Sequence, residues 1–326
     1  MKIRPFIALS SWLAVMIAII AFEVYMNPAF AASSNSTVTA NVAVGNVIYL
    51  AVTPNTIYFN GLAPNSITTT SANDVVTDYD NGGNLAANIL VYGSNLVNSS
   101  SNTILLVGNT IWNATTGKSA TLLTNSFVNT GITILQPNII NSNTSNKIYF
   151  GINIPSGTPP GNYIQTIYFE NENLTSPATY NSPSTSNSVQ LVANVAGYCY
   201  ISLAPNSISF GSVVASSNVP TNVLVTDSDN GGNVAANVLV EGANWYLNGN
   251  IISTSFGVSN TLWDASSQTT YIGTALSNTL ISTPITIPAP TISNSVTSNQ
   301  IYFGLAVPGG TPAGSYEQTI TIENSC

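Results

Sequence analysis

Apolar and polar residues alternate along most of the chain. Residues 38–44 (VTANVAV) alternate, and apolar pairs two positions apart recur as Ile57/Phe59 and Ile208/Phe210. A period of two, with β-branched and aromatic residues enriched, is the pattern of a half-buried strand. Clusters of Gly, Pro, Asn and Asp between these segments predict turns. After the first 31 residues no ten-residue stretch has helical periodicity, so the pattern predicts an all-β fold.

The chain contains one domain written twice. Four segments recur in the same order, at an offset that stays between 149 and 153 residues. They are residues 40–61 with 193–212, 76–93 with 225–242, 111–114 with 262–265, and 148–171 with 301–324. The repeat predicts two tandem β-sandwich domains, at residues 32–173 and 187–326, joined by a Ser/Thr/Pro-rich linker at 174–186.

Three segments of the second copy carry a family resemblance: LAPNSISFG, DNGGNVAANVLVEGANW and PGGTPAGSYEQTITIE. With their counterparts they make nearly all of residues 36–326 similar to the immunoglobulin-like modules of archaeal and bacterial cell-surface proteins. The resemblance implies a β-sandwich at the cell surface. It implies little about activity, because such modules serve as spacers, adhesins, filament subunits and wall components.

The first 31 residues have the pattern of an export signal. Lys2 and Arg4 precede an apolar run from Ile7 to Phe22, and Ala29-Phe30-Ala31 has the small-x-small pattern of a cleavage site. The alternative is a retained membrane anchor. The apolar run has 16 residues, fewer than the roughly 20 that a spanning helix needs, so a cleaved signal is favoured and an extracellular or cell-surface location is predicted.

Charge is scarce. Only 5% of the 326 residues are charged, there is no histidine, and the formal net charge is −8. An acidic chain with four basic residues lacks the Lys/Arg contacts that nucleic acid or anionic lipid requires. Contact with a membrane is therefore expected only through the N-terminal segment, if that segment is not removed. So few titrating groups also predict little dependence of stability on pH.

An acidic loop recurs in both copies. Carboxylates two residues apart in a Gly-rich turn can converge on Ca²⁺, although the pattern of a calcium loop is incomplete. The alternative, which the Asn-Gly sequence favours, is a hairpin turn. The candidate calcium ligands are Asp78, Asp80, Asn81, Asp227, Asp229 and Asn230.

Catalytic signatures are weak. Asp78 and Asp80 stand on what the pattern indicates to be a turn, with no sign of the sugar-binding cleft that a glycosidase pair requires. The lack of histidine excludes a Ser–His–Asp triad and a His-based zinc site. The chain is therefore not expected to be an enzyme, and no cofactor is expected beyond structural Ca²⁺.

Two further features distinguish the copies. Both cysteines, Cys199 and Cys326, fall in the second copy, which in an exported chain favours an intramolecular disulfide over a cross-link between subunits. The N-x-S/T glycosylation sequons all belong to the first copy or its flanks. They stand at Asn35, Asn98, Asn113, Asn143 and Asn173.

The segment Ser36–Val44 has two interpretations. It is either the edge strand of the first domain or a strand that inserts into a neighbouring subunit. A similar segment, Ser188–Ala196, precedes the second domain, which favours the first interpretation. The recurring Trp112 and Trp263 fit core packing better than stacking on a sugar.

The function expected from the sequence is structural: an exported wall, surface-layer or filament component that contacts itself or other surface proteins. The alternative is an adhesin that binds glycans or a partner protein. A hydrolase is the remote third hypothesis.

Overall fold

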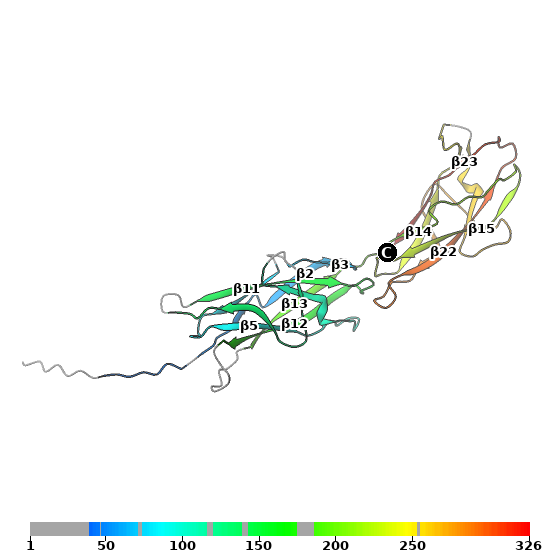
Figure 1. Cartoon of the computed structure of the whole chain (residues 1–326). Coiled ribbons are helices and arrows are strands. Elements are labelled where there is room, and N and C mark those ends of the chain that lie inside the picture. The colour runs from blue at the N-terminus through cyan, green and yellow to red at the C-terminus, as the bar shows by residue number, and fades with distance from the viewer. Residues whose placement is uncertain are drawn as a thin grey trace, which may run out of the picture. The chain divides into compact units, whose positions relative to one another are not determined.

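The computed structural model describes residues 39–45, 47–70, 74–115, 120–138, 143–174, 186–252 and 255–326. The predicted export signal lies outside these ranges. The chain is all-β and forms two immunoglobulin-like β-sandwiches, as the repeat predicted (Figure 1). Each has its own hydrophobic core, drawn from residues 50–195 and 199–322. Across the described ranges, no helix has the length and hydrophobicity to cross a membrane.

The first sandwich has two sheets. One has the order β1–β4–β11–β8–β9, with β3 beside β11. Its strands are β1 (Ala51–Thr53), β3 (Ser66–Ile67), β4 (Val75–Asp80), β8 (Thr110–Asn113), β9 (Thr121–Leu122) and β11 (Thr144–Ile154). The other has the order β10–β5–β12–β13–β2, with β6 between β12 and β7. Its strands are β2 (Thr56–Leu62), β5 (Ala87–Gly93), β6 (Leu96–Asn98), β7 (Ile104–Leu105), β10 (Val128–Ile134), β12 (Gly161–Asn173) and β13 (Ser186–Val195).

The second sandwich repeats this arrangement in part. Its larger sheet has the order β14–β15–β22–β19–β20, and two small sheets have the orders β21–β16–β24 and β18–β17–β23. The strands of the larger sheet are β14 (Ser202–Ala204), β15 (Asn218–Asp229), β19 (Thr261–Asp264), β20 (Thr274–Ala275) and β22 (Thr297–Ala306). The others are β16 (Ala236–Gly242), β17 (Trp245–Leu247), β18 (Ser255–Phe256), β21 (Ile281–Ile287), β23 (Tyr316–Glu317) and β24 (Ile320–Ser325). One 3₁₀ turn lies before β8 and one before β19, η1 (Val107–Asn109) and η2 (Val258–Asn260).

Strand β13 corrects the domain boundary that the sequence indicated. Residues 187–195 were expected to begin the second domain, but β13 lies between β12 and β2 of the first sandwich (Figure 1). It pairs antiparallel with β12 over ten positions and parallel with β2. The first sandwich is thus completed by the segment that follows it. Most of the expected linker, residues 175–185, lies outside the described residues.

Two expected strands are absent from the described residues. Residues 206–210 (NSISF) repeat 55–59 (NTIYF) in sequence, yet only the first copy forms a strand there, β2. Strand β2 has β13 as its only sheet partner, and the second sandwich has no counterpart of β13 among the described residues. Ser36–Val44 was also expected to be a strand; residues 39–44, which the structure describes, form none and have exposed side chains.

Candidate functional site

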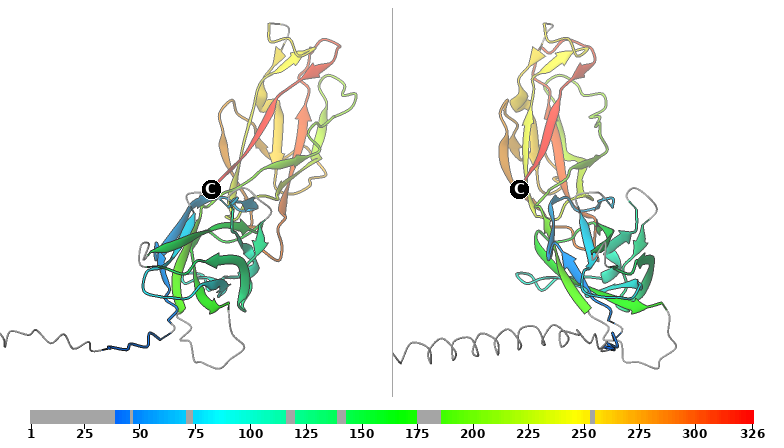
Figure 2. Two further views of the ribbon diagram at one scale, coloured as in Figure 1. Left: turned by 60° about the vertical axis from the view of Figure 1, so that its left-hand side comes forward. Right: turned by 90° about the vertical axis from the view of Figure 1, so that its left-hand side faces the viewer.

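Strand β24 has one unpaired edge. It pairs with β16 from Ile320 to Ser325, as β12 pairs with β5, but no described strand occupies the side on which β13 lies in the first sandwich. Figure 2 shows β24 in red, running to the C-terminus. Along an unpaired edge, backbone N–H and C=O groups that would bond to a neighbouring strand point outward.

The missing strand leaves part of the second core exposed. Ile57 and Phe59 on β2 are only 4% and 5% exposed, whereas their counterparts Ile208 and Phe210 are half-buried. On β12 the inward-facing side chains Tyr163, Gln165, Ile167 and Phe169 are all buried. Their counterparts Tyr316, Gln318, Ile320 and Ile322 are all half-buried.

A cleft runs where β13 would lie. One part has a volume of about 390 Å³ and is lined by residues that include Ile208, Phe210, Ile320 and Ile322. A second part of about 630 Å³ lies between segment 208–215 and segment 311–316. Phe210 and Tyr316 line both parts. The cleft is therefore bounded by the two elements that β13 joins in the first sandwich.

Aromatic side chains gather at one end of this cleft. Trp245 stacks on Phe256 at 5.6 Å between ring centroids and contacts Phe210 edge-on at 6.0 Å. Phe256 lies 5.3 Å from Tyr316. The first copy has Leu96 and Leu105 in place of Trp245 and Phe256, so this cluster is a property of the second sandwich.

The wall of the cleft is held in place by buried hydrogen bonds. Gln318 Nε2 donates to Ala243 O at 2.7 Å, and Thr261 Oγ1 donates to Gln318 Oε1 at 2.8 Å. The same geometry holds Gln165, whose Nε2 donates to Ser94 O at 2.6 Å and whose Oε1 accepts from Thr110 Oγ1 at 2.7 Å. The second sandwich thus keeps the frame that receives a strand, although the strand is absent.

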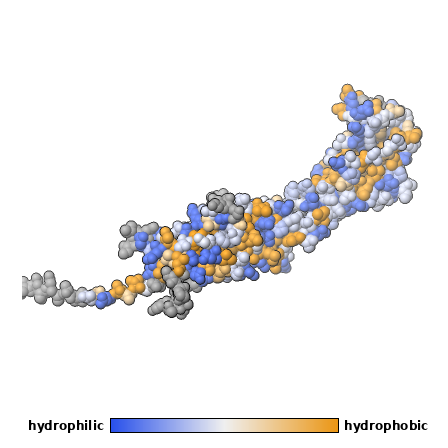
Figure 3. Space-filling view, in the orientation of Figure 1, coloured by the Kyte–Doolittle hydropathy of each residue, from blue (hydrophilic) through white to orange (hydrophobic). Residues whose placement is uncertain are grey.

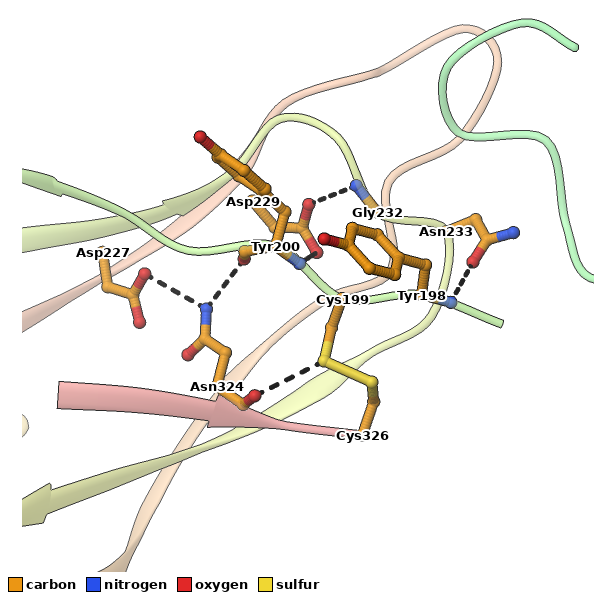
Figure 4. The surroundings of a disulfide bond; sticks show 9 residues. All are labelled: Tyr198, Cys199, Tyr200, Asp227, Asp229, Gly232, Asn233, Asn324 and Cys326. Atoms are coloured by element: carbon orange, nitrogen blue, oxygen red, sulfur yellow. Dashed lines mark hydrogen bonds between the residues drawn. A yellow bond between two sulfur atoms is a disulfide. The ribbon is translucent and has the colours of Figure 1, made fainter. Parts of the chain in front are cut away.

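The acidic loop is a clamped turn between the two sheets of each sandwich and not the expected hairpin, because β4 and β5, like β15 and β16, lie in different sheets. Asp229 Oδ1 accepts the N–H groups of Gly231 and Gly232, at 3.1 and 2.6 Å, and its Oδ2 accepts that of Tyr200 at 3.1 Å (Figure 4). In the first copy Asp80 Oδ1 accepts the N–H of Gly83 at 2.7 Å. A Cβ on Gly83 would lie 2.6 Å from the Asp80 carboxylate, so the close approach requires glycine.

Asparagine completes the clamp on the other side of the loop. Asn233 Oδ1 accepts the N–H of Tyr198 at 2.7 Å (Figure 4). In the first copy Asn84 Oδ1 accepts the N–H of Val47 at 2.8 Å. The loop is therefore tied to the chain that enters each sandwich. The prediction of a turn is confirmed, but the prediction of a hairpin is wrong.

The candidate calcium ligands are divided between the interior and the surface. The four carboxylates are buried, while Asn81 and Asn230 are exposed. No group of three or more His, Cys, Asp or Glu side chains in the described part of the chain is arranged to hold a metal ion. Calcium binding by these residues stays a prediction.

Burial raises the pKa of three carboxyl groups. Both oxygens of Asp78 are buried without a hydrogen-bond partner among the described residues, and burial, with a smaller effect from the charge of Asp80, raises the pKa of Asp78 to about 8. Burial raises the pKa of Asp227 only to about 6, because Asn324 Nδ2 donates to its Oδ1 at 3.2 Å. Burial also raises the pKa of Asp80. The expectation of little pH dependence therefore fails to account for these buried groups.

A disulfide joins Cys199 and Cys326, the pair that the sequence favoured (Figure 4). Their Cα atoms are 6.1 Å apart, and the bond closes a loop of 127 residues. Asn324 Nδ2 also donates to Tyr200 O at 3.0 Å. The end of β24 is thus fixed to the first part of the second sandwich, and the open stretch is residues 316–322, from β23 to the start of β24.

The sequons have different surroundings. Asn98 is buried, its Oδ1 accepts the N–H of Ser100 at 2.9 Å, and it therefore offers no accessible amide for a glycan in the folded state. Asn113 is half-buried and Asn143 is exposed. Asn35 and the side chain of Asn173 lie outside the described residues. Trp112 and Trp263 are buried in the cores, as expected.

The open cleft was not foreseen from the sequence. The available signal was that segments 38–44 and 189–195 resemble each other and that each precedes a copy. We interpreted both as the first strand of the domain that follows. The structure shows that the second of them completes the domain before it.

Comparisons with known proteins give only distant likenesses. No family model and no curated protein sequence matches the chain. Among solved structures, it is similar to the CsuC–CsuE chaperone–tip adhesion subunit complex of Acinetobacter baumannii, with 12% identity and a TM-score of 0.41 over 83% of this chain and 97% of that chain. It is also similar to the CupB6 tip adhesin of Pseudomonas aeruginosa, with 8% identity and a TM-score of 0.29 over 86% of this chain and 98% of that chain. The chain is likewise similar to the Escherichia coli chaperone DraB, with 11% identity and a TM-score of 0.27 over 83% of this chain and 90% of that chain. At these scores the likenesses assign neither family nor function.

Proposed function

We propose that this chain is a structural subunit of an assembly on the outside of the cell: a wall, surface-layer or filament component, and not an enzyme. The observation that carries the proposal is the incomplete second sandwich, with an unpaired edge on β24 and a cleft against residues 207–213. An unpaired strand edge beside an apolar cleft is a site at which another polypeptide can add a strand. The hydrogen bonds of Gln318 keep the wall of this cleft as those of Gln165 do in the first sandwich.

The rest of the molecule supports this proposal. The predicted export signal and the Cys199–Cys326 disulfide agree with an oxidising compartment outside the cytoplasm. The surface carries few charges and many Asn, Ser and Thr side chains. The buried carboxylates are tied into turns or lie within the core, where no substrate reaches them.

The experiment is to determine the size of the exported protein. Protein purified from the cell surface, or refolded without residues 1–31, is examined by sedimentation velocity and negative-stain microscopy. Assemblies that grow with protein concentration support a structural subunit. A monomer at every concentration, both alone and mixed with other surface proteins of the same cell, overturns it.

The second candidate is an adhesin, and the aromatic cluster favours it. Trp245, Phe256 and Tyr316 line the cleft at its open end, and aromatic faces stack on sugars. A glycan array tests this candidate. Binding that Tyr316→Ala abolishes and Tyr168→Ala retains would support an adhesin, because Tyr168 is stacked on Tyr92 in the first sandwich.

A further inference from the structure

The first sandwich contains a template for the strand that the second one lacks. In β13 the side chains of Val189, Leu191, Ala193 and Val195 all point inward and are buried. Ala193 lies in register with Tyr163 of β12 and with Phe59 of β2. In the second sandwich the aromatic residues at these two positions, Tyr316 and Phe210, both line the cleft.

A matching segment occurs elsewhere in the chain. Ala40-Asn41-Val42-Ala43 is identical to Ala193-Asn194-Val195-Ala196, and Val38 corresponds to Leu191. Three of the four residues that point into the first core therefore have apolar counterparts, at positions 38, 40 and 42, while Ser36 stands where Val189 does. Small Ala40 is suited to the place between Tyr316 and Phe210, because Ala193 occupies the equivalent place.

In the described part of the chain, no strand pairs with Thr39–Val44, and every side chain of this segment is exposed. Val42 and Val44 are 87% and 76% exposed, and Figure 3 shows apolar surface on this stretch beside the grey atoms. The position between β12 and β2 of the first sandwich is already taken by β13.

We propose that Thr39–Val44 of a second copy of this chain fills the cleft of the second sandwich as a strand along β23 and the residues just before it, so that copies join head to tail. This inference rests on the proposed function of a structural subunit and names its partner and its contact. The alignment with β13 places Ala40 opposite Tyr316 and Val42 opposite Gly314, antiparallel to the edge. Asn41 then points away from the core, as Asn194 does.

The register supplies a matched pair of variants. Val42→Asp places a charge in the cleft, whereas Asn41→Asp places the same charge on the outer face of the same strand. Both residues are exposed in the free chain, so neither change should affect folding. Burying an unpaired carboxylate is strongly unfavourable, and Val42→Asp is expected to weaken association at least tenfold, while Asn41→Asp changes it little.

The test uses residues 32–326 as wild type, Val42→Asp and Asn41→Asp, followed by sedimentation velocity over a hundredfold range of concentration. The synthetic peptide 36–45 is then titrated into the Val42→Asp chain by calorimetry, with the peptide carrying Val42→Asp as control. We expect polymers of the wild type and of Asn41→Asp, a monomeric Val42→Asp, and binding of the unmodified peptide only.

The outcomes separate the two proposals. Polymers that Val42→Asp does not disrupt would leave a structural subunit standing and overturn the strand exchange. A wild-type monomer at every concentration with no peptide binding would overturn both. A wild-type monomer whose Val42→Asp variant binds the peptide would show that the segment closes its own chain, and would overturn the head-to-tail contact. Binding of a glycan in the cleft with no effect of the peptide would favour the adhesin.

Discussion

Leu191 of β13 lies in register with Ile57 of β2, and both side chains are buried in the first core. The two residues belong to strands at opposite ends of the first domain, and their pairing is parallel. In the second sandwich Ile208 stands where Ile57 does, and no residue in the described part of the chain stands where Leu191 does. The two copies therefore differ by a strand that the sequence repeat conceals.

Truncation of the equivalent residues Ile57 and Ile208 should lower the free energy of unfolding of their sandwiches by unequal amounts. Ile57→Ala removes a side chain that is 4% exposed and should destabilise the first sandwich by about 2–4 kcal/mol. Ile208→Ala removes a half-buried one and should cost the free chain about 1 kcal/mol or less. Hydrogen exchange measured by mass spectrometry, on each sandwich separately, gives both values.

The comparison is made in the Val42→Asp background, so that association does not protect Ile208. Equal costs for the two substitutions would mean that the second core is closed by some other element, and the open cleft would be wrong. Peptide 36–45 should cover Ile208 when it binds in the cleft. The loss of unfolding free energy caused by Ile208→Ala should then rise toward the loss caused by Ile57→Ala.

The buried carboxyl groups should make the protein more stable in acid. The folded pKa of Asp78 is about 8 and that of Asp227 about 6, both above the ordinary 3.8. A raised folded pKa contributes stability that is fully present below the unfolded pKa and is lost as the pH rises through the folded value. The free energy of unfolding should therefore fall between about pH 4 and pH 8, by several kcal/mol for the first sandwich.

Asp78→Asn removes this titration. Urea denaturation of the wild type at pH 4, 6 and 8 should show the fall, and the variant should show a much flatter profile. Asp227→Asn should flatten only the part below about pH 6. If the free energy of unfolding of the wild type rises from pH 4 to pH 8, the raised pKa of Asp78, and with it the burial of its carboxyl group, is wrong.

The disulfide should matter most at the open edge. Cys199 and Cys326 close a loop of 127 residues, worth roughly 4–5 kcal/mol in the chain-entropy model, whose mechanism is disputed. The double variant Cys199→Ser/Cys326→Ser should exchange β24 amides much faster and leave the first sandwich unchanged. Equal protection of β24 in both proteins would show that the bond is not needed to hold that strand.

Calcium should have little effect on stability, since Asp229 already uses both oxygens to accept backbone N–H groups. The melting temperature with 5 mM CaCl₂ is expected to equal that with EDTA. Asp229→Ala should cost about 1–3 kcal/mol through the orphaned N–H groups, with or without calcium. A calcium-dependent rise in melting temperature that Asp229→Ala abolishes would instead establish a calcium site.

The sequence predicted the repeated β-sandwiches because alternation and turn residues are local signals. It did not predict where residues 186–195 pair, because an alternating strand is equally compatible with the sheet before it and the sheet after it. The same limit applies to residues 207–213, which repeat β2 in sequence and lack its partner. Asp78 and Asp80 follow Val76 at a spacing of two, and this alternation places all three side chains on the buried face of β4. The turn residues that follow them favoured a solvent-exposed loop instead.

The most direct test of the account is a cross-link between two copies. One chain carries Ala40→Cys and the other Tyr316→Cys, both without residues 1–31, and each keeps its native disulfide. Directly opposed residues on antiparallel strands have Cβ atoms about 4.5–5.5 Å apart, close enough for a disulfide after small adjustments. Mild oxidation of the mixture should give a linked heterodimer, and the pair Asn41→Cys with Tyr316→Cys should give much less. Equal cross-linking by both pairs, or none by either, would contradict insertion of this segment along β23.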